Sequence, residues 1–198
     1  MLTVNQLTLT HRKDLTVLVD SLSFTLNDGE RLALIGEEGN GKSTLLHLIR
    51  NTLEKRSDLR VFYMPQDVGD LLDFSLSSVE LLSPSGKKEE RSRAGILLGS
   101  MKFTADEMNH PSVGLSGGQK AKLMFLMMAE SGANVLLLDE PTRNLSPLSG
   151  PVIRELLAEY PGCIITVSHD RRLIQEVCTR TVTLTPEGVR PSSFCDNF

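Results

Sequence analysis

One glycine-rich loop limits what this chain can fold into more than any other part of the sequence. Gly36–Thr44 reads Gly-Glu-Glu-Gly-Asn-Gly-Lys-Ser-Thr and fits the G-x-x-x-x-G-K-[ST] pattern of a phosphate-binding loop. The apolar run Arg31–Ile35 precedes the loop, and an amphipathic segment containing Leu45 and Ile49 follows it. This strand–loop–helix context predicts an α/β fold with a parallel sheet core, although a glycine-rich turn before a helix is the alternative reading.

The chemistry of this loop suits a chain of phosphates. Its glycines allow backbone N–H groups to turn inward around an anion, and the following helix points the positive end of its dipole at the same place. Lys42 adds a mobile positive charge for the outer phosphates, and Ser43 offers a hydroxyl to Mg²⁺. We therefore predict that the nucleotide is bound by Gly36, Glu37, Glu38, Gly39, Asn40, Gly41, Lys42, Ser43 and Thr44.

An acidic pair follows a second strongly apolar run. Val135–Leu138 reads as a buried parallel strand, and Asp139 and Glu140 come directly after it. Ligands of open α/β sheets bind at the carboxyl ends of such strands. We predict that Asp139 holds Mg²⁺, directly or through water, and that Glu140 polarises the attacking water.

A third motif narrows the class. Leu115–Gln119 reads Leu-Ser-Gly-Gly-Gln and precedes an expected helix over Gln119–Met128, so it predicts a second phosphate-binding helix N-terminus, with an ordinary loop as the alternative. Together with Gly36–Thr44 and the acidic pair, it resembles the ATP-binding cassette (ABC) ATPases. In that family the motif serves the nucleotide held by the opposite protomer. The resemblance therefore adds four site residues: Ser116, Gly117, Gly118 and Gln119.

The remaining family motifs occur in the expected order. Gln66, after the strand-like run Leu59–Met64, matches the glutamine that reaches Mg²⁺ and water. His169, after the run Cys163–Val167, matches the switch histidine that contacts the γ-phosphate. A surface glutamine and a structural histidine are the alternatives when each residue is taken alone.

Two positions depart from the family pattern. Where the family stacks an aromatic residue on adenine, this chain has His11 and Arg12, which can stack through a flat face and imply modest base selectivity. Ser146 replaces the aspartate that normally follows the catalytic glutamate in the loop crossing the dimer interface. The resemblance implies that communication between the two sites is weakened.

The chain length suits one cassette. With 198 residues, positions 1–198 are expected to form a single ATP-binding domain. Residues from Leu2 to about Leu34 alternate apolar and polar side chains, as half-buried antiparallel strands do, and about 68–114 matches the α-helical subdomain in position and size. The expected elements after Leu59–Met64 are helices at 78–82, 87–98, 104–109, 119–128, 151–160 and 171–177, strands at 135–138 and 163–167, and a closing pair of strands.

Composition excludes some functions. The net charge of −4 gives no general attraction to nucleic acid, so no direct DNA binding is expected. No apolar run approaches the ~20 residues of a membrane span and no signal peptide is evident, so we expect a cytoplasmic protein. The odd number of cysteines, three, favours reduced thiols.

The resemblance implies hydrolysis of Mg-ATP at composite sites of a head-to-tail homodimer, or of a pair with another cassette. The short spacing from Ser43 to Gln66, and Val167–Arg171, resemble the ABC-F branch, whose members typically join two cassettes in one polypeptide and act on the ribosome. The alternative is the energising subunit of a separate membrane transporter. An assembly or repair factor is less favoured, because the sequence has no coiled-coil heptads.

Overall fold

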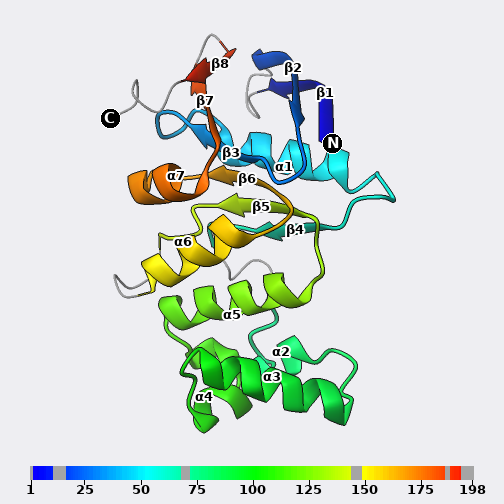
Figure 1. Ribbon diagram of the computed structural model, residues 1–198, viewed down its shortest axis with the longest axis vertical. Helices are drawn as coiled ribbons and strands as arrows, with labels where there is room; N and C mark the ends of the chain where they lie inside the picture. Colours follow the sequence, from blue (N-terminus) through cyan, green and yellow to red (C-terminus); the bar gives the residue numbers. More distant parts are fainter. Residues whose placement is uncertain (1, 11–16, 68–71, 144–148, 186–187, 193–198) are drawn as a thin grey trace. The chain divides into compact units, whose positions relative to one another are not determined.

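The described residues form two compact units. The computed structural model describes residues 2–10, 17–67, 72–143, 149–185 and 188–192 (Figure 1). The first unit comprises 1–66, 133–143 and 150–198, and the second comprises 67–132 and 144–149. The second unit therefore extends beyond the helical insertion expected at 68–114.

The first unit is built on a parallel sheet. Its spatial order is β4-β5-β6-β3-β7-β8, in which the first five strands are parallel and β8 pairs antiparallel with β7. The strands are β3 (Arg31–Ile35), β4 (Val61–Met64), β5 (Val135–Asp139), β6 (Cys163–Val167), β7 (Arg180–Thr185) and β8 (Gly188–Ser192). This sheet confirms the predicted α/β class and the closing pair of strands.

Helices cover both faces of the central strand β3. The helices of this unit are α1 (Lys42–Leu53), α6 (Gly150–Glu159) and α7 (Arg171–Val177). Leu32 and Leu34 pack in the apolar cluster that contains the buried leucines of α1, whereas Ala33 and Ile35 pack against Ile174 of α7. The prediction that half-buried alternation extends to Leu34 is thus wrong within β3, because this strand lies between two parallel partners and is buried on both faces.

An antiparallel hairpin completes the first unit. β1 (Leu2–Thr10) pairs with β2 (Val17–Leu26) from Leu2↔Leu26 to Thr10↔Val17, which confirms the antiparallel strands predicted at the start of the chain. Leu26, the last residue of β2, is fully buried in the same apolar cluster as β3 and α1. The hairpin is therefore anchored to the core at its end nearest the sheet.

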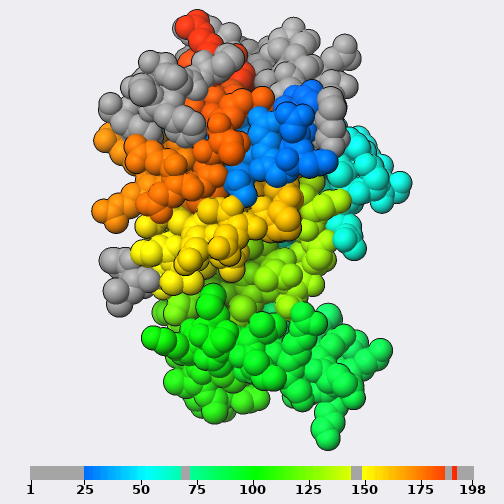
Figure 2. Space-filling model, viewed as in Figure 1, coloured from blue at the N-terminus to red at the C-terminus, as the bar shows by residue number. Residues whose placement is uncertain are grey.

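The two helices α6 and α7 lie side by side. Figure 2 shows their side chains in contact, α6 in yellow and α7 in orange. Arg154 of α6 is buried, and its Nε donates a hydrogen bond to Glu176 Oε2 of α7 at 2.6 Å. This charge-assisted hydrogen bond fixes the two helices against each other.

The second unit is helical. Its elements are α2 (Ser78–Leu82), α3 (Lys88–Ser100), α4 (Ala105–Asn109), the 3₁₀ helix η2 (Ser112–Gly114) and α5 (Gly117–Glu130). Capping boxes start three of these helices, with Ser77, Thr104 and Ser116 as the N-caps. Because Ser116 caps α5, that helix begins at Gly117, earlier than the predicted Gln119. Leu98 and Leu123, both fully buried, lie in the unit's own core.

Among the described residues, no helix is both long enough and apolar enough to span a membrane.

Candidate active site

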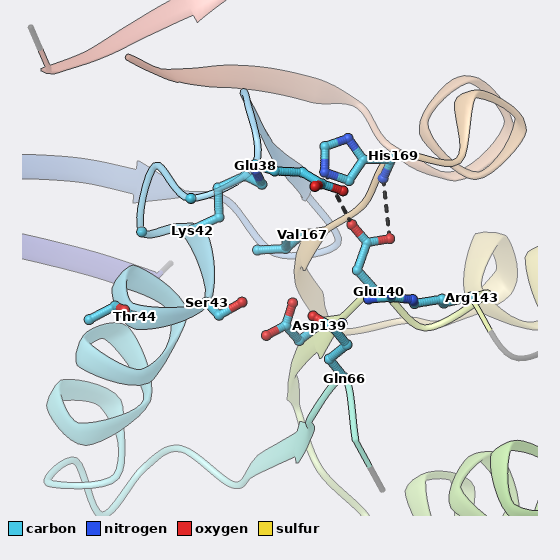
Figure 3. Close-up of a pocket in the computed structure, with 12 residues that line it drawn as sticks. Glu38, Lys42, Ser43, Thr44, Gln66, Asp139, Glu140, Arg143, Val167 and His169 are labelled. Carbon is cyan, nitrogen blue, oxygen red and sulfur yellow. Dashed lines mark hydrogen bonds and ion pairs between the residues drawn. The ribbon is translucent and has the colours of Figure 1, made fainter. Parts of the chain in front are cut away.

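A cavity of about 440 Å³ lies in the first unit, where β3, β4, β5 and β6 end (Figure 3). Carboxyl ends of parallel strands meet at one edge of a sheet, so segments far apart in sequence converge there. The lining residues are Glu38, Gly39, Gly41, Lys42, Ser43, Thr44, Gln66, Asp139, Glu140, Arg143, Val167 and His169. The structure thus brings together most of the phosphate loop, the acidic pair, the glutamine and the histidine that the sequence singled out.

The backbone of the loop can adopt its shape only with glycine. Gly36, Gly39 and Gly41 have φ angles of 140°, 83° and 82°, which other residues rarely adopt. At Gly36 an added Cβ would also lie 2.4 Å from the carbonyl oxygen of Leu184. α1 begins after Gly41 without a side-chain cap, which leaves its positive N-terminus open to an anion.

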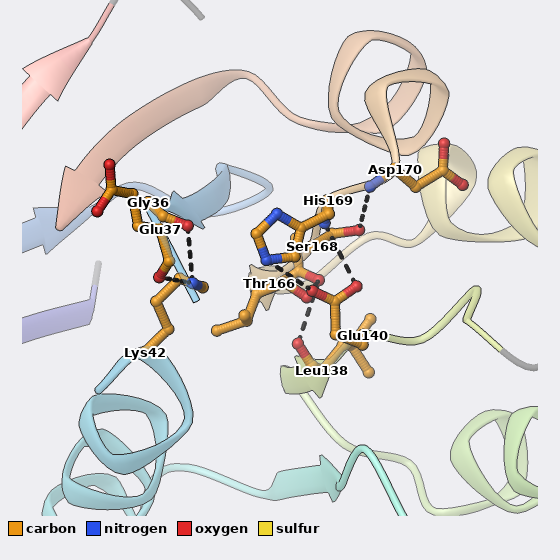
Figure 4. A network of polar contacts seen from close by, with 10 residues as sticks. Gly36, Glu37, Lys42, Leu138, Glu140, Thr166, Ser168, His169 and Asp170 are labelled. Carbon is orange, nitrogen blue, oxygen red and sulfur yellow. Dashed lines mark hydrogen bonds and ion pairs between the residues drawn. The ribbon is translucent and has the colours of Figure 1, made fainter. Parts of the chain in front are cut away.

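The side chain of Lys42, the first residue of α1, folds back against the backbone of the phosphate loop. Its side chain is 7% exposed, and Nζ donates to the carbonyl oxygens of Gly36 at 2.7 Å and Glu37 at 2.6 Å (Figure 4). Burial lowers the pKa of Lys42, and the nearby carboxylate of Glu140 opposes this shift. The ammonium is therefore positioned at the wall of the cavity before any ligand arrives.

Three loop residues that the sequence assigned to nucleotide binding do not line the cavity. Gly36 and Glu37 instead accept the hydrogen bonds of Lys42, and Asn40 Nδ2 donates to Leu184 O of β7 at 3.3 Å. These contacts shape the loop and attach it to the sheet.

Oxygen ligands suited to Mg²⁺ converge on the strand end. Asp139 is 2% exposed, and its Oδ1 has no hydrogen-bond partner among the described residues. Burial raises the pKa of Asp139, and a hydrogen bond from Ser43 opposes this shift. No group of three or more His, Cys, Asp or Glu side chains in the described part of the chain could hold a metal. One carboxylate with the oxygens of Ser43 and Gln66 fits Mg²⁺, which keeps several waters and uses few protein ligands.

Glu140 has an unusual backbone. Its φ of 50° lies in the left-handed region, which costs a non-glycine residue roughly 1–3 kcal/mol. The N–H of Glu140 donates to Val167 O at the end of β6, at 2.8 Å, and this bond helps to hold the strained conformation. Glu140 lines the cavity, and its carboxylate is directed toward His169 (Figure 3).

The carboxylate of Glu140 meets His169. Its Oε2 accepts a hydrogen bond from the backbone N–H of His169 at 3.3 Å, and its Oε1 lies 3.6 Å from His169 Nε2 (Figure 4). Burial raises the pKa of Glu140, and the contacts with His169 oppose this shift. A partly buried carboxylate with a raised pKa is suited to accept a proton from water.

The motif of the second unit begins α5. Ser116 Oγ accepts from Gln119 N at 3.4 Å, and Ser116 N donates to Gln119 Oε1 at 2.8 Å. Gln119 Nε2 also donates to Glu107 Oε1. Ser116 and Gly117 are exposed, so the serine hydroxyl can still donate its proton to an external acceptor. His11 and Ser146 lie outside the described residues.

Sequence reasoning gave no role in the site to three residues of the first unit: Thr142, Arg143 and Asp170. Arg143 lines the cavity one turn beyond Glu140, and its N–H donates to Glu140 O at 3.1 Å. Thr142 Oγ1 donates to Asp170 Oδ2 at 2.9 Å. Only the position of Thr142 beside the acidic pair could have singled it out, because its partner is remote in sequence.

The sheet, the phosphate loop and the acidic strand end define a nucleotide-binding α/β domain. The sequence pattern of the family described as ABC transporter matches residues 19–143, and the chain belongs to this family as an ATP-binding cassette. This confirms the predicted membership of the ATP-binding cassette family.

Individual relatives narrow the assignment. The chain is 35% identical over 197 residues to YdiF of Bacillus subtilis (strain 168), covering 96% of this chain and 30% of that protein. It is 32% identical to ABC transporter F family member 2 of Arabidopsis thaliana, covering 87% of this chain and 27% of that protein. The predicted likeness to the ABC-F branch is confirmed, and the chain spans less than a third of the length of each of these two relatives.

A solved structure confirms the fold. The dimeric structure of a post-hydrolysis state of the ATP-binding cassette MJ0796, bound to ADP and Pi, aligns with a TM-score of 0.78. The alignment covers 98% of this chain and 99% of that chain at 21% identity.

Proposed function

We propose that this cassette binds and hydrolyses Mg-ATP in the cavity at the ends of β3 to β6. The observation that carries the proposal is the convergence of Lys42, Asp139, Glu140 and His169 on the open N-terminus of α1. A helix N-terminus and a buried lysine favour the phosphates, and a neighbouring carboxylate can activate water. We further propose that residues 1–198 form one cassette.

The proposed roles follow from position. Lys42 and the backbone N–H groups of the loop bind the β- and γ-phosphates, and Glu140 orients water for in-line attack and accepts its proton. His169 stabilises charge on the transferring phosphoryl group, and its backbone N–H donates a hydrogen bond to the carboxylate of Glu140. Gln66, at the end of β4, contacts the water and the metal.

Mg²⁺ would be held by Ser43, Asp139 and Gln66. When bound, it neutralises charge that develops on the phosphate oxygens. Among the residues that the structure describes, Asp139 Oδ1 has no hydrogen-bond partner, which supports this assignment because a buried carboxylate oxygen without a hydrogen bond is costly unless a cation or water satisfies it.

A second cassette would complete the site. The exposed hydroxyl of Ser116 and the N-terminus of α5 can bind an anion, and we propose that they cover the γ-phosphate held by a partner chain. Two identical chains would then associate head to tail with two-fold symmetry. Pairing with a different cassette is the alternative partner arrangement.

Light scattering tests the pairing. At tens of micromolar protein in saturating Mg-ATP, the Glu140→Gln variant should be dimeric and the nucleotide-free chain mainly monomeric. Phosphate release per molecule by the unchanged chain should rise with protein concentration. A Glu140→Gln protein that stayed monomeric in Mg-ATP would refute self-pairing and favour a different partner cassette.

The cellular role is proposed from the relatives. Similarity to F family proteins favours an ATPase that acts on the ribosome in the cytoplasm, and the alternative is an energising subunit of a membrane transporter. Sedimentation of the tagged chain from cell lysate distinguishes the two. Co-sedimentation of the Glu140→Gln variant with ribosomes in the presence of ATP supports the first role. Recovery of the chain with the membrane fraction supports the second.

A further inference from the structure

A hydrogen bond outside the cavity joins the two segments that carry Glu140 and His169. Thr142 Oγ1 donates to Asp170 Oδ2 at 2.9 Å, and both side chains are partly buried. Thr142 follows Glu140 by one turn residue, and Asp170 directly follows His169. The bond therefore spans from the segment after β5 to the segment after β6.

Asp170 is itself firmly placed. Its Oδ1 accepts from the N–H groups of Arg172 at 2.9 Å and Leu173 at 3.2 Å, which caps α7, and its own N–H donates to Ser168 Oγ at 3.0 Å. One carboxylate oxygen thus serves the helix cap and the other serves Thr142. The Thr142 bond is separable from the cap, because removing the threonine hydroxyl leaves Oδ1 and its two donors unchanged.

The segment held by Thr142 is under strain. Glu140 has a φ of 50°, and the contacts between its carboxylate and His169 are long, at 3.3 and 3.6 Å. Long contacts do not by themselves fix a side chain, so its position depends on how the two backbones are held. The bond from Glu140 N to Val167 O joins the two backbones at Glu140 itself, and the bond from Thr142 to Asp170 joins the two segments again two residues later.

We propose that Thr142 and Asp170 form a clasp that sets the position of Glu140 relative to His169, and that Thr142 is a positioning residue for hydrolysis. The inference rests on the proposed catalytic role of Glu140. Opening the clasp lets the Glu140 turn relax, so the carboxylate moves away from the attacking water while the phosphate loop is undisturbed. A small displacement of such a group costs up to about a hundredfold in rate.

The test replaces the hydroxyl with a methyl group of similar size. Thr142→Val should lower kcat by roughly ten- to a hundredfold and leave ATP affinity, measured with a fluorescent analogue, within about twofold. Thr142→Ser keeps the hydroxyl and should restore most of the rate. Thr52→Val is the matched control, because Thr52 Oγ1 also makes one hydrogen bond, to Leu48 O at 2.9 Å in α1.

A double-mutant cycle separates positioning from a general loss of structure. If Thr142 acts through Glu140, adding Thr142→Val to Glu140→Gln should lower the residual turnover little further. The clasp would be overturned if Thr142→Val lowered turnover by the same factor in the unchanged chain and in Glu140→Gln. It would also be overturned if Thr142→Val left kcat unchanged. Full turnover in Glu140→Gln alone would instead overturn the proposed function, so the two failures are distinguishable.

Discussion

The two helix N-termini that the sequence assigned to phosphate differ in how their first turns are satisfied. α1 follows Gly41 and has no side-chain cap, so its N-terminus opens into a cavity lined by Lys42, Asp139 and Glu140. α5 is closed by a capping box in which Ser116 and Gln119 satisfy each other's backbone N–H groups. An uncapped N-terminus inside a cavity is prepared for a bound anion, whereas a capped and exposed one is stable alone and offers only its dipole and a hydroxyl.

This contrast bears on how the proposed site works. The site at the N-terminus of α1 has the groups for ground-state binding and water activation within one unit. Substitutions there should impair nucleotide binding or the chemical step in the single chain. The N-terminus of α5 contributes to a nucleotide held by another chain, so substitutions there should spare nucleotide binding. Single substitutions at Glu140, Ser116 and Lys42 test this division.

The largest effect is expected at Glu140. Replacing Glu140 with Gln should lower steady-state phosphate release by ~10²–10⁴-fold, because a general base typically contributes that factor, and should leave ATP binding intact. Glu155→Gln, an exposed change on α6, should have no effect. Hydrolysis by Glu140→Gln within about threefold of the unchanged chain would mean that another group activates water.

At α5, Ser116→Arg should remove most turnover and spare ATP binding. We expect a loss of roughly 10²–10³-fold, the size found when a donor to a developing negative charge is removed. Ser100→Arg, exposed at the end of α3, controls for an added arginine, and circular dichroism checks that α5 stays folded without its cap. Weakened ATP binding in Ser116→Arg would contradict the proposed division between the two N-termini.

Lys42→Ala should weaken nucleotide binding itself. The loss of a charge-assisted contact to phosphate corresponds to roughly ten- to a hundredfold in affinity. Titration with a fluorescent ATP analogue measures it, with the exposed Lys55→Ala as the control. An unchanged affinity would remove the phosphate loop from the proposed site.

The smallest effect concerns stability. Burial raises the pKa of Glu140 above its ordinary value of 4.5, so its ionised form destabilises the fold at neutral pH. Glu140→Gln should therefore raise Tm at pH 7, by roughly 2–4 °C per kcal/mol of relieved desolvation. The gain should shrink as pH falls through the raised pKa and vanish below the ordinary one, where the glutamate is protonated in both states. A gain independent of pH in calorimetric scans would point to a cause other than charge.

Local patterns in the sequence determined much of this protein. The spacing of glycines in Gly36–Thr44 and the continuous apolar runs of β5 and β6 depend on neighbouring residues only, so loop and strands could be predicted before the structure. The same holds for α2, predicted at its observed bounds, because its capping box lies within a few residues. The roles of the site residues were predicted from resemblance to a family.

Only the tertiary structure decided what depends on contacts between distant segments. The strand order β4-β5-β6-β3-β7-β8 differs from the order along the chain, and burial of β3 on both faces follows from its two parallel partners. The positive φ of Glu140, its contacts with His169 and the bond from Thr142 to Asp170 arise because β5 and β6 end side by side. Sequence periodicity records which face of an element is apolar, but not which remote element will cover it, so these features required the packed sheet.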